Sequence, residues 1–389
     1  MFKVQTLNNI SRNGLDRLPV SLYRVANEIA DADAVLVRSA DMHKSAIPPS
    51  VKAVARAGAG VNNIPVAELS ARGVPVFNAP GANANAVKEL VVAGMLLAAR
   101  NLADALSFVH QLKAGDADLH HRVEAEKKRF VGSELSGKVL GVVGLGAIGV
   151  RVANAAYALG MRVLGFDPHM TVEGAWQLSS EVVKAGSLGE LIAASDYITF
   201  HVPLNDRTLG IFGAQALASA RQGVVLLNFA REGIVDPATL REGLASGRIG
   251  RYVSDFPDAD LLGNPRVIAL PHLGASTGEA EENCAVMVVD QLRDFLEHGN
   301  VRHSVNFPET RMARTGIARI CIANQNRPNM IGQLSHVLGQ AGVNIAQMHN
   351  ASRSDLAYSL IDVDTPVPDS LIAAIAAIDG ILSVRVIPS

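Results

Sequence analysis

Short runs of consecutive apolar residues recur along the first 270 residues of the chain, with stretches of helical periodicity between them. Hydrophobicity that is continuous rather than alternating indicates strands covered on both faces, as in a parallel sheet. Strands that alternate with helices in this way predict a doubly wound α/β fold. The runs of strand length are residues 34–37, 53–57, 74–77, 139–143, 162–166, 197–200, 224–228 and 267–270.

This alternation breaks at two places. An alanine- and leucine-rich segment, 85–100, predicts a long helix and precedes a polar, charge-mixed stretch at 113–129. A second long helix is expected over 276–297, before a segment that has proline, polar residues and no periodicity, as linkers do. We therefore predict two Rossmann-like domains with parallel sheets, at 1–100 with 276–300 and at 101–275, followed by a linker at 301–316 and a small domain at 317–389.

The small C-terminal domain has its own pattern. The order of its elements is β-α-β-β-α-β, which is the split arrangement of a ferredoxin-like fold. The predicted strands are 317–322, 343–348, 356–363 and 381–387, and the predicted helices are 330–341 and 369–378.

Composition narrows the class of protein. The chain has 389 residues, 49% of them apolar and 19% charged, and its formal net charge is −2. Such a chain has enough apolar material for packed cores, and it lacks the basic excess that nucleic acids or anionic membranes attract. No apolar run approaches the ~20 residues that cross a bilayer, and the N-terminus does not resemble a signal peptide, so we expect a cytoplasmic protein. We expect no metal site and interpret the two cysteines, Cys284 and Cys321, as buried apolar fillers.

A glycine motif predicts a dinucleotide site. Gly144-Leu145-Gly146-Ala147-Ile148-Gly149 follows one predicted strand and opens a helix, and Asp167 ends the next strand. The first glycine allows the turn, the second lets a pyrophosphate approach the backbone, and the third lets helix and strand pack closely. Asp167 can accept hydrogen bonds from the adenosine ribose hydroxyls and would repel a 2′-phosphate. NAD is therefore favoured over NADP.

Two further polar residues follow predicted strands. Arg231 comes after the strand 224–228 and His272 after 267–270, so both are expected at the edge where ligands bind in open α/β sheets. Oxidation of an alcohol beside a carboxylate needs a cation, a base and a hydride acceptor. Arginine suits the first role and histidine, with a pKa near ~6.5, the second. A carboxylate would orient the histidine, and either Asp260 or Asp258 could supply it.

These motifs together resemble the D-2-hydroxyacid dehydrogenase family. The matching segments are RAGAGV at 56–61, GLGAIG at 144–149, HVPL at 201–204, NFAREGIVD at 228–236 and PHLGAST at 271–277. The resemblance spans nearly the whole chain. It implies that the first domain binds substrate, that the second binds NAD, and that the protein is a homodimer or homotetramer.

The resemblance also implies roles for individual residues. Arg231 matches the substrate-orienting arginine and His272 the acid/base histidine, while the family's glutamate falls at Asp260, one methylene shorter and without the usual glutamate-proline signature. Asp258 therefore remains an alternative. The implied cofactor residues are Gly144, Gly146, Ala147, Ile148, Gly149, Asp167, His201, Val202, Phe229, Ala230, Asp255, His272, Gly274 and Ala275. The implied substrate residues are Arg38, Ser39, Arg56, Gly58, Ala59, Gly60 and Arg231.

The resemblance further implies an activity. It is strongest to the branch that oxidises 3-phosphoglycerate to 3-phosphohydroxypyruvate with NAD, the first step of L-serine biosynthesis. Another activity of the family, such as glyoxylate or hydroxypyruvate reduction, and a non-catalytic NAD-responsive binding protein are the alternatives. The C-terminal domain resembles an ACT domain, in which Asn324, Asn326 and Asn344 match effector positions of serine-regulated relatives. A domain that serves oligomerisation without a ligand fits the same pattern.

Overall fold

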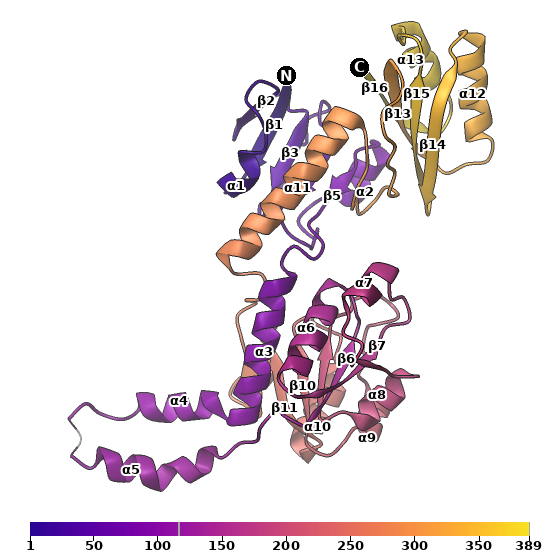
Figure 1. The fold of residues 1–389 in the computed structure, drawn as a ribbon. Helices are drawn as coiled ribbons and strands as arrows, with labels where there is room; N and C mark the ends of the chain where they lie inside the picture. The colour runs from indigo at the N-terminus through magenta and orange to yellow at the C-terminus, as the bar shows by residue number, and fades with distance from the viewer. Residues whose placement is uncertain (116, 389) are drawn as a thin grey trace. The chain divides into compact units, whose positions relative to one another are not determined.

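The structure, a computed structural model, describes residues 1–115 and 117–388. Its contacts form two compact units, which are described separately below (Figure 1). Unit 1 comprises Met1–Asn83 and Gly278–Ser389, and unit 2 comprises Ala84–Thr277.

The first part of unit 1 is built on a five-stranded parallel sheet with the strand order β2-β1-β3-β4-β5. Helix α11 (Gly278–His298) packs its apolar face, including Val288 and Leu292, against strand residues such as Leu36 and Ala55. The sequence pattern did not predict β1 and β2, because polar residues interrupt them and both are only partly buried. The elements are β1 (Phe2–Leu7), α1 (Arg12–Leu15), β2 (Tyr23–Ala26), β3 (Ala34–Val37), η1 (Met42–Lys44), β4 (Ala53–Arg56), α2 (Val66–Ala71) and β5 (Val76–Phe77).

Unit 2 contains a seven-stranded parallel sheet with the order β12-β11-β10-β9-β6-β7-β8. Strands β6, β7 and β8 extend the sheet toward one edge, and β9 to β12 extend it from β6 toward the other edge. The position between β6 and β9 is therefore the topological switch point, where dinucleotides bind in Rossmann folds. The strands are β6 (Val139–Val143), β7 (Arg162–Phe166), β8 (Val183–Lys184), β9 (Tyr197–Phe200), β10 (Val224–Asn228), β11 (Ile249–Ser254) and β12 (Val267–Ala269). The helices that cover it are α3 (Ala84–Arg100), α6 (Ala147–Ala158), α7 (Val172–Gln177), α8 (Leu188–Ala194), α9 (Ala214–Ser219) and α10 (Pro237–Ser246), and η3 (Ala259–Leu261) precedes β12.

Helix α3 belongs to unit 2. Its Val91 and Met95 are fully buried in one cluster with Leu140 of β6 and Val152 of α6. The contact boundary therefore falls at 83/84, whereas the sequence pattern places it near residue 100, at the end of the same helix. The pattern marks where an apolar helix ends, but it does not indicate which of two sheets that helix covers.

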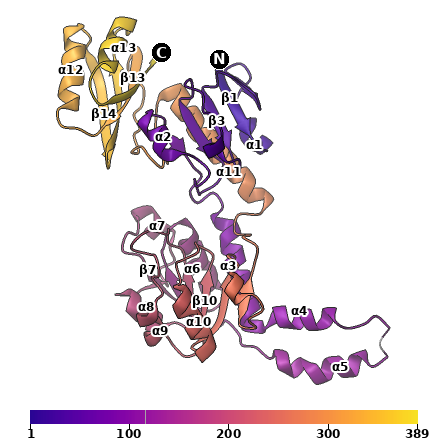
Figure 2. The same ribbon diagram turned by 180° about the vertical axis from the view of Figure 1, so that it is seen from behind.

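A helical arm projects from unit 2, as both ribbon views show (Figures 1 and 2). It consists of α4 (Leu102–His110), α5 (Leu119–Glu126) and η2 (Lys127–Phe130), and the rings of Phe108 and Phe130 lie 5.5 Å apart within it. Among the described residues, no single helix is long and apolar enough to cross a membrane; α3 and α4 reach that threshold only as a pair, which is bent by 73°.

The C-terminal part of unit 1 confirms the β-α-β-β-α-β order. Its four strands are antiparallel in the order β14-β15-β13-β16. One face of the sheet, with Ile320 and Ile322, packs on the two helices, and the other, with Cys321 and Ala323, joins the core under α11. The elements are β13 (Ala318–Gln325), α12 (Met330–Gln340), β14 (Ile345–Arg353), β15 (Leu356–Val363), α13 (Asp369–Ala376) and β16 (Ile381–Pro388).

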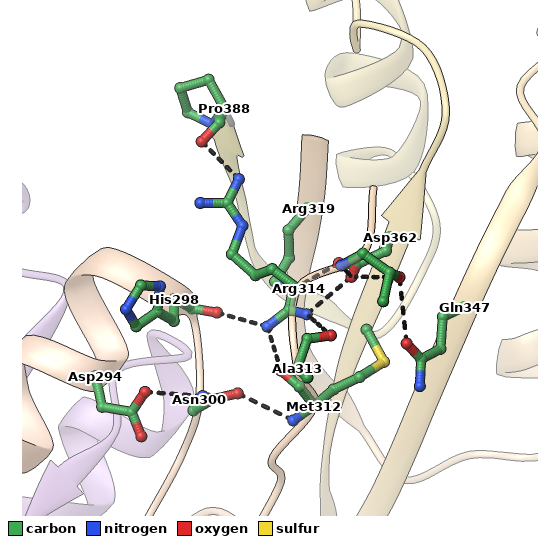
Figure 3. Close-up of polar contacts among 11 residues, drawn as sticks. Asp294, His298, Asn300, Met312, Ala313, Arg314, Arg319, Gln347, Asp362 and Pro388 are labelled. Carbon is green, nitrogen blue, oxygen red and sulfur yellow. Dashed lines mark hydrogen bonds and ion pairs between the residues drawn. The ribbon is translucent and has the colours of Figure 1, made fainter. Parts of the chain in front are cut away.

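The segment predicted as a linker, 301–316, is packed into unit 1. Val301 and Thr310 pair as an isolated antiparallel bridge, and Phe307 is fully buried. Just after this segment, the guanidinium of Arg319 donates hydrogen bonds to the carbonyls of His298 at 2.8 Å, Met312 at 2.8 Å and Ala313 at 2.9 Å (Figure 3). The same guanidinium forms an ion pair with Asp362. The pattern missed this packing because specific polar bonds, rather than periodic apolar residues, hold the segment.

Candidate active site

Most of the predicted cofactor and catalytic residues gather at one edge of the unit 2 sheet. Gly144 follows β6, Asp167 follows β7, Arg231 lies three residues after β10, Asp255 follows β11 directly and His272 lies three residues after β12. Because all these strands are parallel, their carboxyl ends share one edge, which is where open α/β sheets bind ligands.

The three glycines of the motif occupy distinct environments. Gly144 has a φ of +92°, and a Cβ there would lie 2.6 Å from the carbonyl oxygen of His201 across the switch point. A Cβ on Gly149 would lie 1.9 Å from the carbonyl oxygen of Gly144, so only glycine lets α6 approach the turn. Gly146 is exposed, and a Cβ there would meet nothing within 4 Å. This open space in front of the first amides of α6 is where a pyrophosphate fits.

Asp167 is held in place by the same turn. One of its carboxylate oxygens accepts a hydrogen bond from the amide of Leu145 at 2.8 Å, and the other accepts one from the amide of His169 at 2.8 Å. Carboxylate oxygens accept several hydrogen bonds each, so Asp167 retains acceptor capacity for ribose hydroxyls. The arrangement fits the adenosine end of NAD.

Two alanine substitutions should separate the role of the turn in cofactor binding from its role in helix packing. We expect Gly146→Ala to leave the melting temperature nearly unchanged, because its φ of −76° suits alanine, and to weaken NADH binding at least tenfold by filling the open space. Gly149→Ala, whose Cβ would collide with backbone, should lower the melting temperature by several degrees. Fluorescence titration with NADH and thermal melts measure the two effects. Equal melting losses in both variants would contradict the assigned roles.

His201 is a half-buried residue beside the glycine turn. Burial lowers the pKa of its imidazole to about 3. Its Nε2 lies 3.0 Å from the Thr199 hydroxyl, while Nδ1 is buried and has no hydrogen-bond partner in the described chain. The ring is therefore uncharged at neutral pH, and the imidazole has a nitrogen to spare for a ligand.

The loop that carries Arg231 is anchored by a buried asparagine. Asn228, 1% exposed, donates from Nδ2 to the carbonyl of Arg231 at 2.9 Å and accepts at Oδ1 from the amide of Ala230 at 3.2 Å. The Arg231 side chain is exposed and donates to the carbonyl of Ala230 at 2.7 Å. Asn228 is not among the site residues predicted from the sequence. A polar residue that ends an otherwise apolar strand is, however, a sequence signal for such an anchor.

His272 is held through its backbone. Its amide donates to the carbonyls of Asp255 and Leu270, each at 3.0 Å, and its φ is +52°, an uncommon value for a residue other than glycine. The imidazole is exposed, and its ring lies 5.0 Å from the ring of Phe256 in an edge-on arrangement. The imidazole is therefore available to a ligand at the sheet edge.

A buried carboxylate lies close to both catalytic candidates. Asp255 is 1% exposed; its Oδ2 accepts from the amide of Gly274 at 3.0 Å, and its Oδ1 has no partner among the described residues. Burial raises the pKa of this carboxyl group, while the nearby charges of His272 and Arg231 act in the opposite direction. Arg231, Asp255 and His272 therefore share one electrostatic environment. The unpartnered oxygen suits an amide such as that of a nicotinamide.

The acids predicted to orient His272 have other contacts. Asp260 lies 3.4 Å from Nη1 of Arg241, and the Asp258 carboxylate accepts from the amide of Asp260 at 2.9 Å. Within the described residues, neither carboxylate bonds to His272. The acid that the structure brings near His272 is Asp255, which the family resemblance implied only for the nicotinamide. A pairing of Asp260 or Asp258 with His272 stays a prediction.

The predicted substrate residues lie at the corresponding edge of unit 1. Arg38 follows β3, and Arg56 ends the neighbouring strand β4, with Val37 and Arg56 paired in the ladder. Arg38 forms an ion pair with Glu281 at the start of α11, and Arg56 donates to the carbonyl of Gly60 at 2.7 Å. Both guanidinium groups are close enough to act on the pKa of the Cys284 thiol, which burial raises. Unit 1 thus presents two arginines at one sheet edge.

The remaining predicted substrate residues form the backbone around these arginines. The amide of Ser39 donates to Oδ1 of Asn8 at 3.2 Å, and the carbonyl of Ala59 accepts from the Asn78 side chain at 2.5 Å. A Cβ on Gly58 would lie 2.5 Å from Nη1 of Arg56, so glycine makes room for the guanidinium.

The three predicted effector residues do not converge within one chain. Asn324, near the end of β13, is paired with Ala357, whereas Asn344 precedes Ile345, which is paired with Val363. Six residues of strand separate these positions along β15, or about 20 Å at ~3.3 Å per residue. Asn324 is buried with Oδ1 unpartnered, Asn326 donates to the carbonyl of Ser354 at 3.0 Å, and Asn344 donates to Asp364 at 3.0 Å. One small molecule cannot contact all three asparagines of one chain.

Comparison with known proteins shows which proteins this chain is similar to. Residues 92–274 match the family described as D-isomer specific 2-hydroxyacid dehydrogenase, NAD binding domain. The chain is 35% identical over 343 residues to D-3-phosphoglycerate dehydrogenase of Methanocaldococcus jannaschii, which covers 85% of this chain and 60% of the relative. Among solved structures, it is similar to a glyoxylate reductase from Paecilomyes thermophila, with a TM-score of 0.64 and 26% identity over 78% of this chain and 98% of that one.

An NAD+-bound 3-phosphoglycerate dehydrogenase from Entamoeba histolytica is also similar, with a TM-score of 0.60 and 26% identity over 78% of this chain and 98% of that one. Residues 92–274, which make up most of unit 2, therefore form an NAD-binding domain of the D-2-hydroxyacid dehydrogenase type. The chain spans about three fifths of the length of the curated relatives it matches, which are named D-3-phosphoglycerate dehydrogenase.

Proposed function

We propose that the protein catalyses the NAD-dependent oxidation of 3-phosphoglycerate to 3-phosphohydroxypyruvate, the entry step of L-serine biosynthesis. The observation that carries the chemistry is the gathering of Arg231, Asp255 and His272 at the sheet edge that also holds the glycine turn. The names of relatives at 34–36% identity support the choice of substrate.

The proposed mechanism assigns one task to each side chain. Arg231 binds the C1 carboxylate and the C2 oxygen through its planar fork of N–H donors. The exposed imidazole of His272 removes the proton from the C2 hydroxyl as the C2 hydride departs. NAD supplies the hydride acceptor when it is bound. Asp255 stabilises positive charge on the two groups that flank it, and this effect is strongest as His272 becomes protonated.

Residues near the cofactor would act by position. The amides at the start of α6, beginning at Ala147, face the open space at Gly146 and would hold the pyrophosphate, and Asp167 would hold the adenosine ribose. Ile148, Val202 and Phe229 would supply apolar contacts, and Ala230 and Ala275 lie in the loops that carry Arg231 and His272. None of these residues takes part in proton transfer.

The two arginines of unit 1 favour a phosphorylated substrate. A phosphate dianion needs cationic partners, and Arg38 and Arg56 lie together at the carboxyl edge of β3 and β4. A ligand phosphate would compete with Glu281 for Arg38. Glyoxylate and hydroxypyruvate lack a phosphate, so reductases that act on them have no need of this pair.

A substrate panel tests the proposal. We expect NAD reduction with D-3-phosphoglycerate to have a kcat/KM at least tenfold above that of unphosphorylated 2-hydroxy acids. Arg38→Gln should lower kcat/KM for 3-phosphohydroxypyruvate at least tenfold, and that for glyoxylate by less than threefold. Higher kcat/KM with glyoxylate or hydroxypyruvate would assign the protein to the reductases, and no turnover with any acid would favour a binding protein.

We assign the C-terminal domain to the ACT type on its β-α-β-β-α-β order and its sheet order. Since Asn324 and Asn344 lie far apart in one chain, a serine site that used both would need a second copy of the chain. Serine regulation therefore goes together with the proposed homodimer or homotetramer.

A further inference from the structure

A cavity of about 270 Å³ lies inside unit 1, where the C-terminal domain packs against the five-stranded sheet domain. Its walls come from the segment 49–52, the turn 72–74, helix α11 through Phe295, and strands β13, β15 and β16. Neither the catalytic candidates nor the predicted effector asparagines line it.

One buried polar group points to a ligand. Tyr358 of β15 lines the cavity and is 2% exposed. Its hydroxyl lies beside the Cys321 thiol and the Arg385 guanidinium, but it makes no hydrogen bond of acceptable geometry within the described chain. Burial raises the pKa of this hydroxyl well above its usual value, so it is a neutral O–H donor. A buried hydroxyl without a partner destabilises the folded chain, and an acceptor in the cavity would offset this loss.

The charge of the walls favours an anion. The described lining has three cationic side chains, Lys52, Arg72 and Arg385, and no acidic one. Lys52 is paired with Asp33 at 2.8 Å, and Arg72 lies 3.6 Å from Glu68. Arg385 forms no ion pair with a described carboxylate.

The bonds of Arg385 leave it donors to spare. Its guanidinium donates to the carbonyl of Phe295 at 2.5 Å and to that of Leu296 at 3.2 Å, and it lies 4.2 Å from the centre of the Phe295 ring. A guanidinium has five N–H donors; these two bonds use two of them, and the group also interacts with the neighbouring Tyr358 hydroxyl and Cys321 thiol. Arg385 and Tyr358 can therefore both donate to one ligand.

We propose that this cavity is a binding site for a small oxyanion, a phosphate or carboxylate group, held by the Tyr358 hydroxyl and the Arg385 guanidinium. Charge-assisted hydrogen bonds from arginine suit both kinds of anion. The site is separate from the sheet edges that carry the proposed reaction. Because its walls come from both parts of unit 1, an anion there would strengthen the packing of the C-terminal domain.

Calorimetric titration of the full chain with inorganic phosphate and, separately, with acetate tests the site. Tyr358→Phe keeps the ring and removes only the hydroxyl, and we expect it to weaken binding of the preferred anion at least tenfold, as loss of a hydrogen bond to a charged group does. Without anion, the variant should melt at the same temperature as the parent chain or above it. Tyr157→Phe, which changes an exposed hydroxyl on α6, is the matched control and should leave binding unchanged.

The parent chain and the Tyr358→Phe variant both retain Arg38 and Arg56. A difference in anion binding between them therefore reports on this cavity alone. A crystal soaked in selenate adds a direct readout, with an anomalous peak expected within hydrogen-bonding distance of Tyr358 and Arg385. Identical affinities of the parent and Tyr358→Phe for both anions, or a cavity that contains only water in the soaked crystal, would overturn the proposal.

Discussion

His272→Ala is expected to reduce turnover of the proposed reaction by about 10²- to 10⁴-fold, which is the usual contribution of a positioned general base. NADH affinity should change less than threefold. The reason is geometric: the imidazole is exposed at the sheet edge, whereas the backbone of residue 272 is fixed by its own hydrogen bonds to Asp255 and Leu270. The substitution removes the base and leaves the glycine turn at Gly144 intact.

Steady-state kinetics and fluorescence titration with NADH measure the two quantities separately. His336→Ala is a suitable control, because His336 is exposed on α12 in the C-terminal domain. Parallel losses of turnover and NADH affinity in His272→Ala would mean that the residue supports the loop rather than the chemistry.

How well the sequence predicted the fold depended on burial. The strands 139–143, 162–166, 197–200 and 224–228 were predicted with the bounds that the structure has, because central parallel strands are apolar over most of their length. Strand β11 (Ile249–Ser254) was missed, since Arg251 and Ser254 interrupt its apolar run. Edge strands and polar junctions leave a weaker periodic signal than a covered core does.

The candidate site shows the same limit. Glycine spacing and residues at strand ends predicted the positions of Gly144, Arg231 and His272 at one edge, because strand order in a parallel sheet brings successive carboxyl ends together. The proximity of Asp255 to His272 could not be predicted, because it depends on loop conformation. The carbonyl of Asp255 accepts a hydrogen bond from the amide of His272, and the φ of His272 is positive. The spacing of His272 from Arg231 in the sequence indicates neither feature.

Arg319→Met is expected to have the largest effect on stability, a loss of about 3–5 kcal/mol, because it strands a buried charge. Arg319 is fully buried and Asp362 is 1% exposed. The pair is bidentate, with Nε to Oδ1 at 2.6 Å and Nη2 to Oδ2 at 2.9 Å (Figure 3). Three backbone carbonyls take the remaining N–H groups, so the guanidinium is fully satisfied. Urea unfolding measures the loss.

Two further variants separate charge from packing. Arg314→Met is the control, because Arg314 is only half-buried and donates one bond, to the carbonyl of Pro388 at 2.7 Å; it should change stability by less than ~0.5 kcal/mol. The double variant Arg319→Met with Asp362→Leu should recover part of the loss, since the unpaired carboxylate is gone but the carbonyls of Met312 and Ala313 still lack donors. A double variant no more stable than Arg319→Met would show that the carbonyl bonds, not the ion pair, dominate.

The pH dependence of the free energy of unfolding shows whether Asp362 stabilises or destabilises the folded chain. Burial alone would raise the pKa of Asp362, but hydrogen bonds from Arg319 and Thr315 outweigh it and hold the pKa below its usual value. The pair therefore stabilises the folded chain above about pH 4, the ordinary range of an unfolded aspartate, and this stability is lost as the pH falls through the lower folded pKa. In Arg319→Met the sign reverses. Without the guanidinium, the buried carboxyl binds a proton more readily when folded, so the variant should gain stability relative to the parent chain between pH 7 and pH 5. A stability gap that stays constant over this range would contradict the buried-charge explanation.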